Sequence, residues 1–196
     1  MSDKNLNPII QFKEWFNLAI SKEINDPNAM CLSTISSDNK PHSRMVLLKD
    51  YNDEGFVFYT NYESNKGNDI SINSNVCLNF HWKSLLRQVR IEGNIEKLSE
   101  ETSDKYYNSR HYLSRIGAWA SDQSRTLNNR KELEEKIEFY KEKYPDKKKV
   151  PRPPYWGGLL IRHRKIEFWQ DMPHRIHRRD VYEFQRGVWG RFALNP

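Results

Sequence analysis

The chain has 196 residues, which is enough for one domain with a substantial core and marginal for two. Hydrophobic residues make up 37% and charged residues 30%, so the composition excludes a disordered chain. The net charge of +6 fits an anionic partner, such as nucleic acid, an anionic membrane surface or a phosphorylated small molecule. Charge alone does not choose among these partners.

The two cysteines, Cys31 and Cys77, lie far apart in apolar, strand-like runs without the spacing of a metal site. We therefore expect buried, reduced thiols in a cytoplasmic protein. The N-terminus MSDKNLNP is polar and predicts no signal peptide, and no apolar run approaches transmembrane length.

A helix is predicted over about residues 8–25, because Asn7 can cap it and Pro8 suits its first position. Runs rich in β-branched and aromatic residues then predict strands, and turn sequences such as SSDNKP and YNDEG separate them. These runs are AMCLSTIS, SRMVLLKD, GFVFYT, NVCLNFHW and RQVRIEGNIEKL. Their close spacing favours a meander or barrel over β-α-β units.

A helical insert is predicted over about residues 99–144. Ser99 can cap its first helix, HYLSRIGAWAS resembles a second, and NNRKELEEKIEFYKEKY has the apolar stripe of a third. Strand signals return over about residues 157–196, in WGGLLIRH, KIEFWQ, RDVYEFQ and GVWGRFAL. We expect residues 1–196 to form a single β-rich α+β domain whose sheet is closed by the C-terminal strands.

The sequence has no Rossmann or Walker phosphate loop, no H-E-x-x-H and no G-x-S-x-G. A phosphate would therefore have to be held by side chains on strands and loops. Arg44 and Lys49 flank one apolar strand and would point to opposite faces of it, so this stretch alone favours a solvated strand end. In FYTNYESNK, hydroxyls and Lys66 follow a strand in a polar loop and could form a weak anion site.

If residues 106–114 are helical, Tyr106, Arg110 and Ser114 share one face and could grip a phosphate. A tyrosine packed on an arginine stem explains the same spacing equally well.

The stretch HRIHRR, residues 174–179, has two histidines and three arginines in six positions. In a strand, Arg175, His177 and Arg179 would alternate onto one face and require an anionic or π-rich partner. A basic edge strand that blocks aggregation is the alternative. Trp169, just before it, is either a core residue or a wall for ring stacking.

Together these stretches resemble the pyridoxamine/pyridoxine 5′-phosphate oxidase family along nearly the whole chain. The matching stretches are SRMVLLKDYNDEGFVFYTN, LLRQVRIEG, KYYNSRHYLSRIGAWASDQS, PPYWGG, IEFWQ, HRIHRR and WGRFALNP. The resemblance implies an FMN-binding split β-barrel with peripheral helices, and a homodimer that holds FMN where the subunits meet. It also implies oxidation of a phosphorylated B6 vitamer to pyridoxal 5′-phosphate, with hydride transfer to flavin N5 and reoxidation by O₂ to give H₂O₂.

The resemblance carries site residues over by matching position. The residues implied to contact FMN are Arg44, Met45, Val46, Leu47, Leu48, Lys49, Tyr59, Thr60, Lys66, Gln88, Gln123, Ser124, Trp169 and Arg179. Those implied to hold the substrate phosphate are Lys49, Tyr106, Arg110 and Ser114. Arg175 and His177 are implied to lie over the substrate ring as catalytic residues, Arg175 as a planar cation and His177 as a hydrogen-bonding partner of the ring oxygens.

Three departures from the family pattern bear on these expectations. Asn65 stands where the family usually has Arg or Lys, which predicts weaker FMN binding. Arg178 stands where the family usually has Asp, so a pairing partner for the cluster would be lost, with little effect on catalysis. The Arg-Arg-x-Tyr stretch that many relatives use upstream to cover the substrate is not found, so we expect closure to be achieved differently.

Three alternatives remain. A flavin oxidase of the same fold could act on another ring, as in phenazine biosynthesis, although the set of phosphate-holding residues favours a phosphorylated substrate. A flavin-binding relative without catalysis would be yellow but inert. A nucleic-acid-binding barrel would be colourless and would bind oligonucleotides with a steep salt dependence. We expect neither a nucleic acid nor a membrane as partner.

Overall fold

The computed structural model describes residues 6–196. Within them, one antiparallel sheet is formed by β1 (Ala29–Ile35), β2 (Pro41–Leu47), β3 (Asp50–Asn52), β4 (Gly55–Asn61), β5 (Asn75–Trp82), β6 (Arg87–Lys97), β7 (Trp156–Gln170), β8 (Arg178–Gln185) and β9 (Val188–Ala193). The helices are α1 (Pro8–Lys22), α2 (Asn65–Ile72), α3 (Glu100–Ser109), α4 (Tyr112–Ala120) and α5 (Arg130–Lys143). No helix in this described part combines the length and apolar character needed to cross a membrane.

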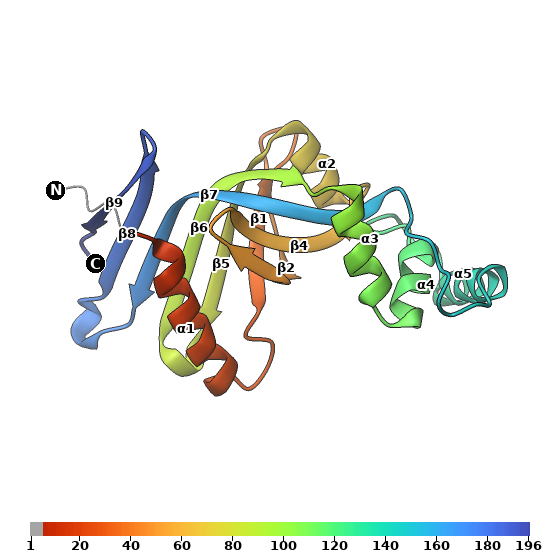
Figure 1. Ribbon diagram of the computed structural model, residues 1–196, viewed down its shortest axis with the longest axis horizontal. Helices are drawn as coiled ribbons and strands as arrows, with labels where there is room; N and C mark the ends of the chain where they lie inside the picture. The colour runs from red at the N-terminus through yellow and green to blue at the C-terminus, as the bar shows by residue number, and fades with distance from the viewer. Residues whose placement is uncertain (1–5) are drawn as a thin grey trace.

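The strand β7 organises the sheet because it pairs with three other strands (Figure 1). Its first half pairs with β4, its second half with β8, and β6 accompanies it along its length. We had expected two strands here, WGGLLIRH and KIEFWQ, and the structure has one. The register shift opposite Glu92 and Gly93 absorbs the extra residue, and a Cβ at Gly93 would lie 2.2 Å from the Arg162 carbonyl oxygen.

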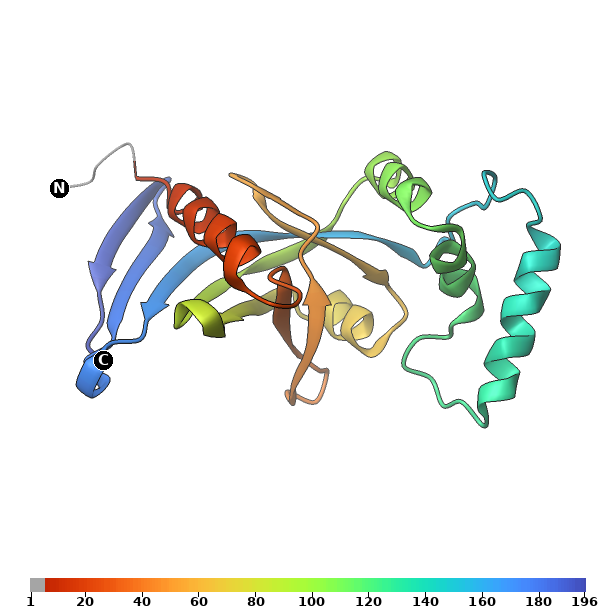
Figure 2. The same cartoon turned by 90° about the horizontal axis from the view of Figure 1, so that it is seen from below.

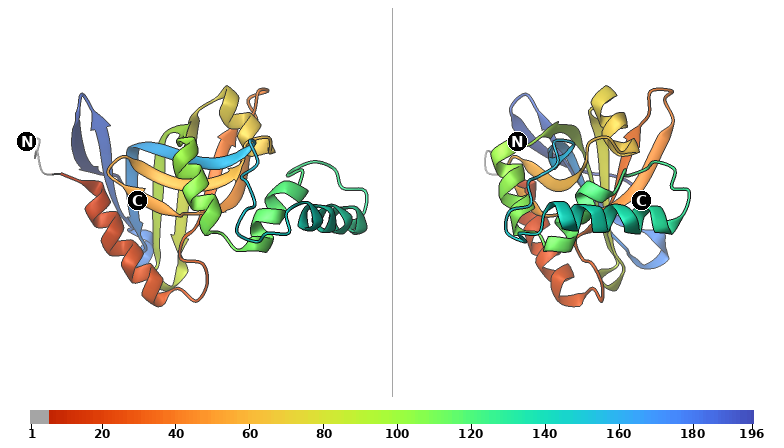
Figure 3. Two further views of the ribbon diagram at one scale, coloured as in Figure 1. Left: turned by 45° about the vertical axis from the view of Figure 1, so that its right-hand side comes forward. Right: turned by 90° about the vertical axis from the view of Figure 1, so that its right-hand side faces the viewer.

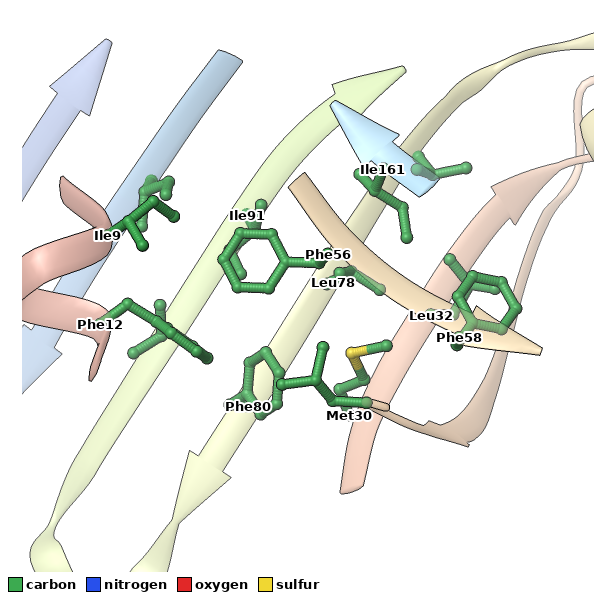
Figure 4. Close-up of a cluster of buried hydrophobic side chains, with 14 of the residues drawn as sticks. Ile9, Phe12, Met30, Leu32, Phe56, Phe58, Leu78, Phe80, Ile91 and Ile161 are labelled. Carbon is green, nitrogen blue, oxygen red and sulfur yellow. The ribbon is translucent and has the colours of Figure 1, made fainter. Parts of the chain in front are cut away.

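The hydrophobic core lies between α1 and the curled sheet (Figure 4). Asn7 caps α1 by accepting from the amide of Ile9, as the sequence predicted. The fully buried Phe12 of α1 contacts Phe56 and Phe80 edge to face, with ring centroids 4.8 and 5.4 Å apart. This aromatic packing fixes the helix across the sheet.

The helices of the insert lie at the end of the molecule where β7 begins (Figures 2 and 3). There α4 and α5 extend away from the sheet and pack on each other through Trp119 and Tyr140, whose rings are 5.6 Å apart. The hairpin of β8 and β9 lies at the other end, where β7 finishes. The two ends of β7 therefore carry different parts of the predicted site.

Candidate functional site

The first cluster of site residues lies where β4 ends and α2 begins. The Lys66 ammonium donates to Gln123 Oε1 at 2.8 Å, to Ser64 Oγ at 3.1 Å and to Thr60 Oγ1 at 3.2 Å. All these partners are neutral. Burial, assisted by the nearby charge of Arg44, lowers the pKa of Lys66 to about 8. A desolvated cation beside a second cation is a place where an anion is stabilised.

The helix α2 was missed by the sequence analysis, which placed Ser64 and Lys66 in a loop. Ser64 is the N-cap of α2 and accepts from the amide of Gly67. Serine is a common N-cap residue, so Ser64 could have indicated a helix start. The eight residues of α2 include glycine and asparagine, however, and their intrinsic helix propensity is weak. Asn65, the first residue of this helix, is exposed.

The second cluster surrounds Arg110 at the junction of α3 and α4. A cavity of about 280 Å³ is lined by Arg110, Ser114 and Gln123, among others. The Arg110 guanidinium lies 4.6 Å above the Trp156 ring. Its Nη1 is buried without a hydrogen-bond partner, and burial lowers the pKa of Arg110. Because Gln123 also bonds Lys66, the two cationic clusters are adjacent.

The sequence predicted separate helices in SEETSDKYYNSR and HYLSRIGAWAS, and the structure has this division, so the condition that residues 106–114 form one helix is not met. The helix α3 ends at Ser109, Arg110 is extended with φ −74° and ψ 151°, and the His111 side chain caps α4. This break turns Arg110 toward Trp156, while Tyr106 stacks on Tyr59 with ring centroids 3.7 Å apart. Trp156 was not singled out as a site residue from the sequence; only its place in PPYWGG pointed to it.

The third cluster lies at the other end of β7, on the strands β6, β7 and β8. Gln88, Trp169 and Arg179 are direct cross-strand partners, so they form one row on one face of the sheet. The Nε of Arg179 donates to Glu167 at 2.7 Å, and Arg90 also donates to Glu167, at 3.0 Å. Glu167, which is 4% exposed, was missed by the sequence analysis.

The strand on which the alternation of Arg175, His177 and Arg179 depended begins only at Arg178. Residues 173–175 form a short 3₁₀ turn, and His174 and Arg175 have φ of 59° and 62°. Arg175 is exposed, whereas the His177 ring lies 4.6 Å from the Trp169 ring, with Nδ1 2.9 Å from an Asp171 oxygen.

Arg178 begins β8, at the position where we expected the replacement of the family's Asp to remove a pairing partner from the cluster. It donates to Asp180 at 2.7 Å.

The remaining predicted residues lie on and just after β2 and in the loop after α4. Residues 44–47 belong to β2, whereas Leu48 is buried and Lys49 is exposed beyond the strand end. Arg44 and Lys49 therefore do not share one straight strand. Gln123 and Ser124 lie in the loop after α4, where Ser124 has φ 70°. Within one chain, Arg110 lies over Trp156 at the start of β7, whereas Arg175, His177 and Arg179 follow the end of that strand.

The curled antiparallel sheet with peripheral helices defines a split β-barrel protein. A solved structure of this class is a pyridoxamine 5′-phosphate oxidase-related, FMN binding protein from Nostoc punctiforme PCC 73102. Its TM-score is 0.76 at 15% identity, and the match covers 99% of this chain and 100% of that chain. The likeness at this identity concerns the fold, and it confirms the predicted fold class.

The chain belongs to the pyridoxamine 5′-phosphate oxidase family. Residues 16–144 match the model described as pyridoxamine 5′-phosphate oxidase. Residues 156–196 match the model described as the pyridoxine 5′-phosphate oxidase C-terminal dimerisation region. The family resemblance expected from the sequence is thereby confirmed.

Similar proteins are found among enzymes and solved structures. The pyridoxine/pyridoxamine 5′-phosphate oxidase of Pelagibacter ubique is 52% identical over 192 residues, which cover 97% of this chain and 92% of the relative. That of Gloeothece citriformis is 49% identical over 196 residues, with 100% and 91% covered. PhzG from Burkholderia lata 383, solved with tetrahydrophenazine-1-carboxylic acid, is 28% identical with a TM-score of 0.91, covering 99% of this chain and 95% of that chain.

Proposed function

We propose that the protein is an FMN-dependent oxidase that converts pyridoxamine or pyridoxine 5′-phosphate to pyridoxal 5′-phosphate. The observation that carries this proposal is the buried, unpartnered Nη1 of Arg110 beside Ser114, next to the Lys66 cluster. Lys66 and Arg110 are adjacent cations that form no ion pair with a carboxylate of the described residues, and they suit two phosphate esters, one of the cofactor and one of the substrate. The identity of about 50% to oxidases with this name supports the same substrate class.

The chain's residues divide between cofactor and substrate. Lys66 and Arg44 would neutralise the FMN phosphate, and the row of Gln88, Trp169 and Arg179 would line the flavin. The other residues we propose for FMN are Met45, Val46, Leu47, Leu48, Lys49, Tyr59, Thr60, Gln123 and Ser124. When bound, FMN accepts the hydride from the substrate and returns the electrons to O₂, giving H₂O₂.

Substrate binding would rest on charge and orientation. Arg110 and Ser114, with Lys49 and Tyr106, would hold the phosphate, and Arg175 and His177 would cover the ring. Fixing the reacting carbon in this way is an orientation effect, which contributes up to roughly 7–11 kcal/mol in ideal cases. The protein thus supplies binding and alignment.

The complete site would need two chains. The C-terminal residues 156–196 match a dimerisation region, and one chain places Arg110 and Arg175 at opposite ends of β7. We therefore propose a homodimer in which Arg110 of one subunit and Arg175 of its partner face the same substrate.

Mixing two inactive variants tests this shared site. Arg110→Ala and Arg175→Ala homodimers each lack one component of every site. After unfolding and refolding as a mixture, half of the dimers are heterodimers, and each has one intact site, so about a quarter of wild-type activity returns. If each site came from one chain, no activity would return.

Anaerobic reduction tests the reaction itself. The purified protein should be yellow, and pyridoxamine 5′-phosphate without oxygen should bleach its flavin band. Readmitted air should restore the band and release H₂O₂ and pyridoxal 5′-phosphate. Bleaching by a dihydrophenazine but by no B6 vitamer would instead support a PhzG-like substrate, and a colourless protein that binds oligonucleotides would reject both.

A further inference from the structure

A buried polar network ties α2 to β1 and β2. Asp69 of α2 is 6% exposed, and its Oδ2 accepts from Thr34 Oγ1 at 2.6 Å and lies 2.9 Å from His42 Nδ1. Thr34 of β1 is 1% exposed. Burial by itself raises the pKa of Asp69, but the hydrogen bonds from Thr34 and His42, together with the nearby positive charge of Arg44, outweigh burial, and the pKa is lowered. The carboxylate is therefore charged near neutrality.

The network continues from Thr34 to Arg44 of β2. The Nη1 of Arg44 donates to Thr34 Oγ1 at 2.6 Å, and the Nη2 lies 3.6 Å from Asp69. A carboxylate only accepts, so the single hydroxyl proton of Thr34 points to Asp69. The lone pairs of Thr34 are then free for Arg44. Asp69 thus determines the orientation of the hydroxyl that holds the guanidinium.

Two cations of the proposed phosphate site stand on separate elements. Lys66 is on α2, three residues before Asp69, and Arg44 is on β2. They are close enough that the charge of Arg44 contributes to the lowered pKa of Lys66. Like charges repel, so their spacing must be maintained by other contacts. The side-chain bonds of Asp69 to β1 and β2 join the two elements at this place.

We propose that Asp69, acting through Thr34, is a positioning residue for the FMN phosphate, because it fixes Arg44 relative to Lys66. This inference rests on the proposed function. Nothing in the family comparisons assigns a role to either residue.

Charge and positioning predict opposite changes in FMN affinity when Asp69 is removed, so the direction of the change tests the inference. Asp69 is an anion, and by charge alone its removal should strengthen the binding of a dianion. Positioning predicts the opposite, that removal weakens binding. Thr34→Val separates the two effects, because it keeps the side-chain shape, deletes the hydroxyl and leaves the charge unchanged.

The experiment compares affinities for FMN and for riboflavin, which lacks the phosphate, by fluorescence quenching of the apoprotein. Thr34→Val and Asp69→Asn should each weaken FMN binding by about tenfold, equivalent to one charge-assisted contact, and leave riboflavin binding unchanged. Asp38→Asn is the matched control, because Asp38 is an exposed carboxylate in the turn between β1 and β2 that pairs with Lys40. It should change neither affinity.

Three results would overturn the inference. The first is an FMN affinity of Asp69→Asn that equals or exceeds that of the wild type, and the second is an FMN affinity of Thr34→Val equal to that of the wild type. The third is an equal loss of affinity for FMN and riboflavin, which indicates general structural damage. Wild-type protein that does not prefer FMN to riboflavin would instead reject the proposed phosphate site. The failure of the inference and that of the proposed function are therefore distinguishable.

Discussion

The cationic side chains at the two ends of β7 differ in whether they have carboxylate partners. At the helical end, burial lowers the pKa of Lys66 and of Arg110, and no carboxylate contributes to either shift. At the hairpin end, Arg179 shares the buried Glu167 with Arg90, and Asp180 accepts from Arg178 at 2.7 Å and from Arg191 at 3.0 Å. At the helical end, Lys66 and Arg110 form no ion pair with a described carboxylate, although the neighbouring Arg44 lies 3.6 Å from Asp69. At the hairpin end, Arg178 and Arg179 of β8 each pair with a carboxylate.

We expect this difference to give the cations of the two ends different roles, the binding of an anion at the helical end and a fixed side-chain orientation at the hairpin end. An unpaired, desolvated cation gains most from an incoming dianion, because the anion removes an existing electrostatic cost. A paired guanidinium gains less, but its partner fixes its direction. We therefore expect substitutions at the helical end to change affinity, and those at the hairpin end to change stability first.

The largest effect is expected from Glu167→Gln, which would replace the carboxylate between Arg90 and Arg179 at the hairpin end by a neutral amide. Two guanidiniums would lose their shared carboxylate, so the free energy of unfolding should fall by about 3 kcal/mol. Urea denaturation measures this change. The control is Glu96→Gln on the neighbouring strand β6, whose pair with Arg162 is exposed and should contribute under about 1 kcal/mol.

Arg110→Gln should lower kcat/KM for pyridoxamine 5′-phosphate by about 100-fold, or about 3 kcal/mol of transition-state binding. The free energy of unfolding should not fall, because the variant removes a buried cation without a carboxylate. Steady-state kinetics and urea denaturation together check this pair of outcomes. Arg162→Gln, an exposed arginine, should leave kcat/KM unchanged, and a stability loss in Arg110→Gln would contradict our description of the helical end.

FMN binding should depend on pH through Lys66. Since the pKa of Lys66 is about 8, the ammonium loses its proton as pH rises past 8, and FMN affinity should fall above that pH and be constant below it. Lys66→Met should weaken binding at pH 7 by about 20-fold and abolish this pH dependence. Equilibrium dialysis from pH 6.5 to 9.5 measures both. A wild-type affinity that is flat to pH 9.5 is incompatible with an anion beside Lys66.

The smallest effect concerns His163 of β7, which is buried against Trp189 of β9 with ring centroids 5.4 Å apart. Burial lowers the pKa of His163 from 6.5 to about 4, so below pH 6.5 the unfolded chain binds a proton that the folded chain excludes. Stability should therefore fall by about 1–2 kcal/mol between pH 7 and pH 5. His163→Phe, which keeps a stacking ring, should lose this part of the pH dependence in urea titrations.

Much of the fold was predictable because local signals agreed with tertiary packing. Alternating apolar residues located the strands, and Asn7 and Ser99 marked helix starts that the structure confirms. The β7 strand was divided in two because HRK interrupts its apolar pattern, and the bulge that accommodates Arg164 depends on the partner strand β6.

The site was less predictable because its geometry depends on backbone irregularities. The sequence divided the helices near Arg110, but the orientation of Arg110 in the break could not be read from it. Pro173 marks the turn before Arg175, whereas the positive φ of Arg175 itself, which removes the regular alternation of a strand, has no glycine to indicate it. The importance of Glu167 and Asp69 arises from partners distant in sequence, which a single sequence does not reveal.

The continuity of β7 has a consequence for how this chain can vary in length. Trp156 and Trp169 lie at or near its two ends, and the twelve strand residues between them span about 40 Å. An inserted or deleted residue there would reverse the face of every side chain beyond it and shift one half of the site against the other. Insertions should instead be tolerated at the β8–β9 turn around Gly187, where a longer loop does not change the separation of Trp156 and Trp169.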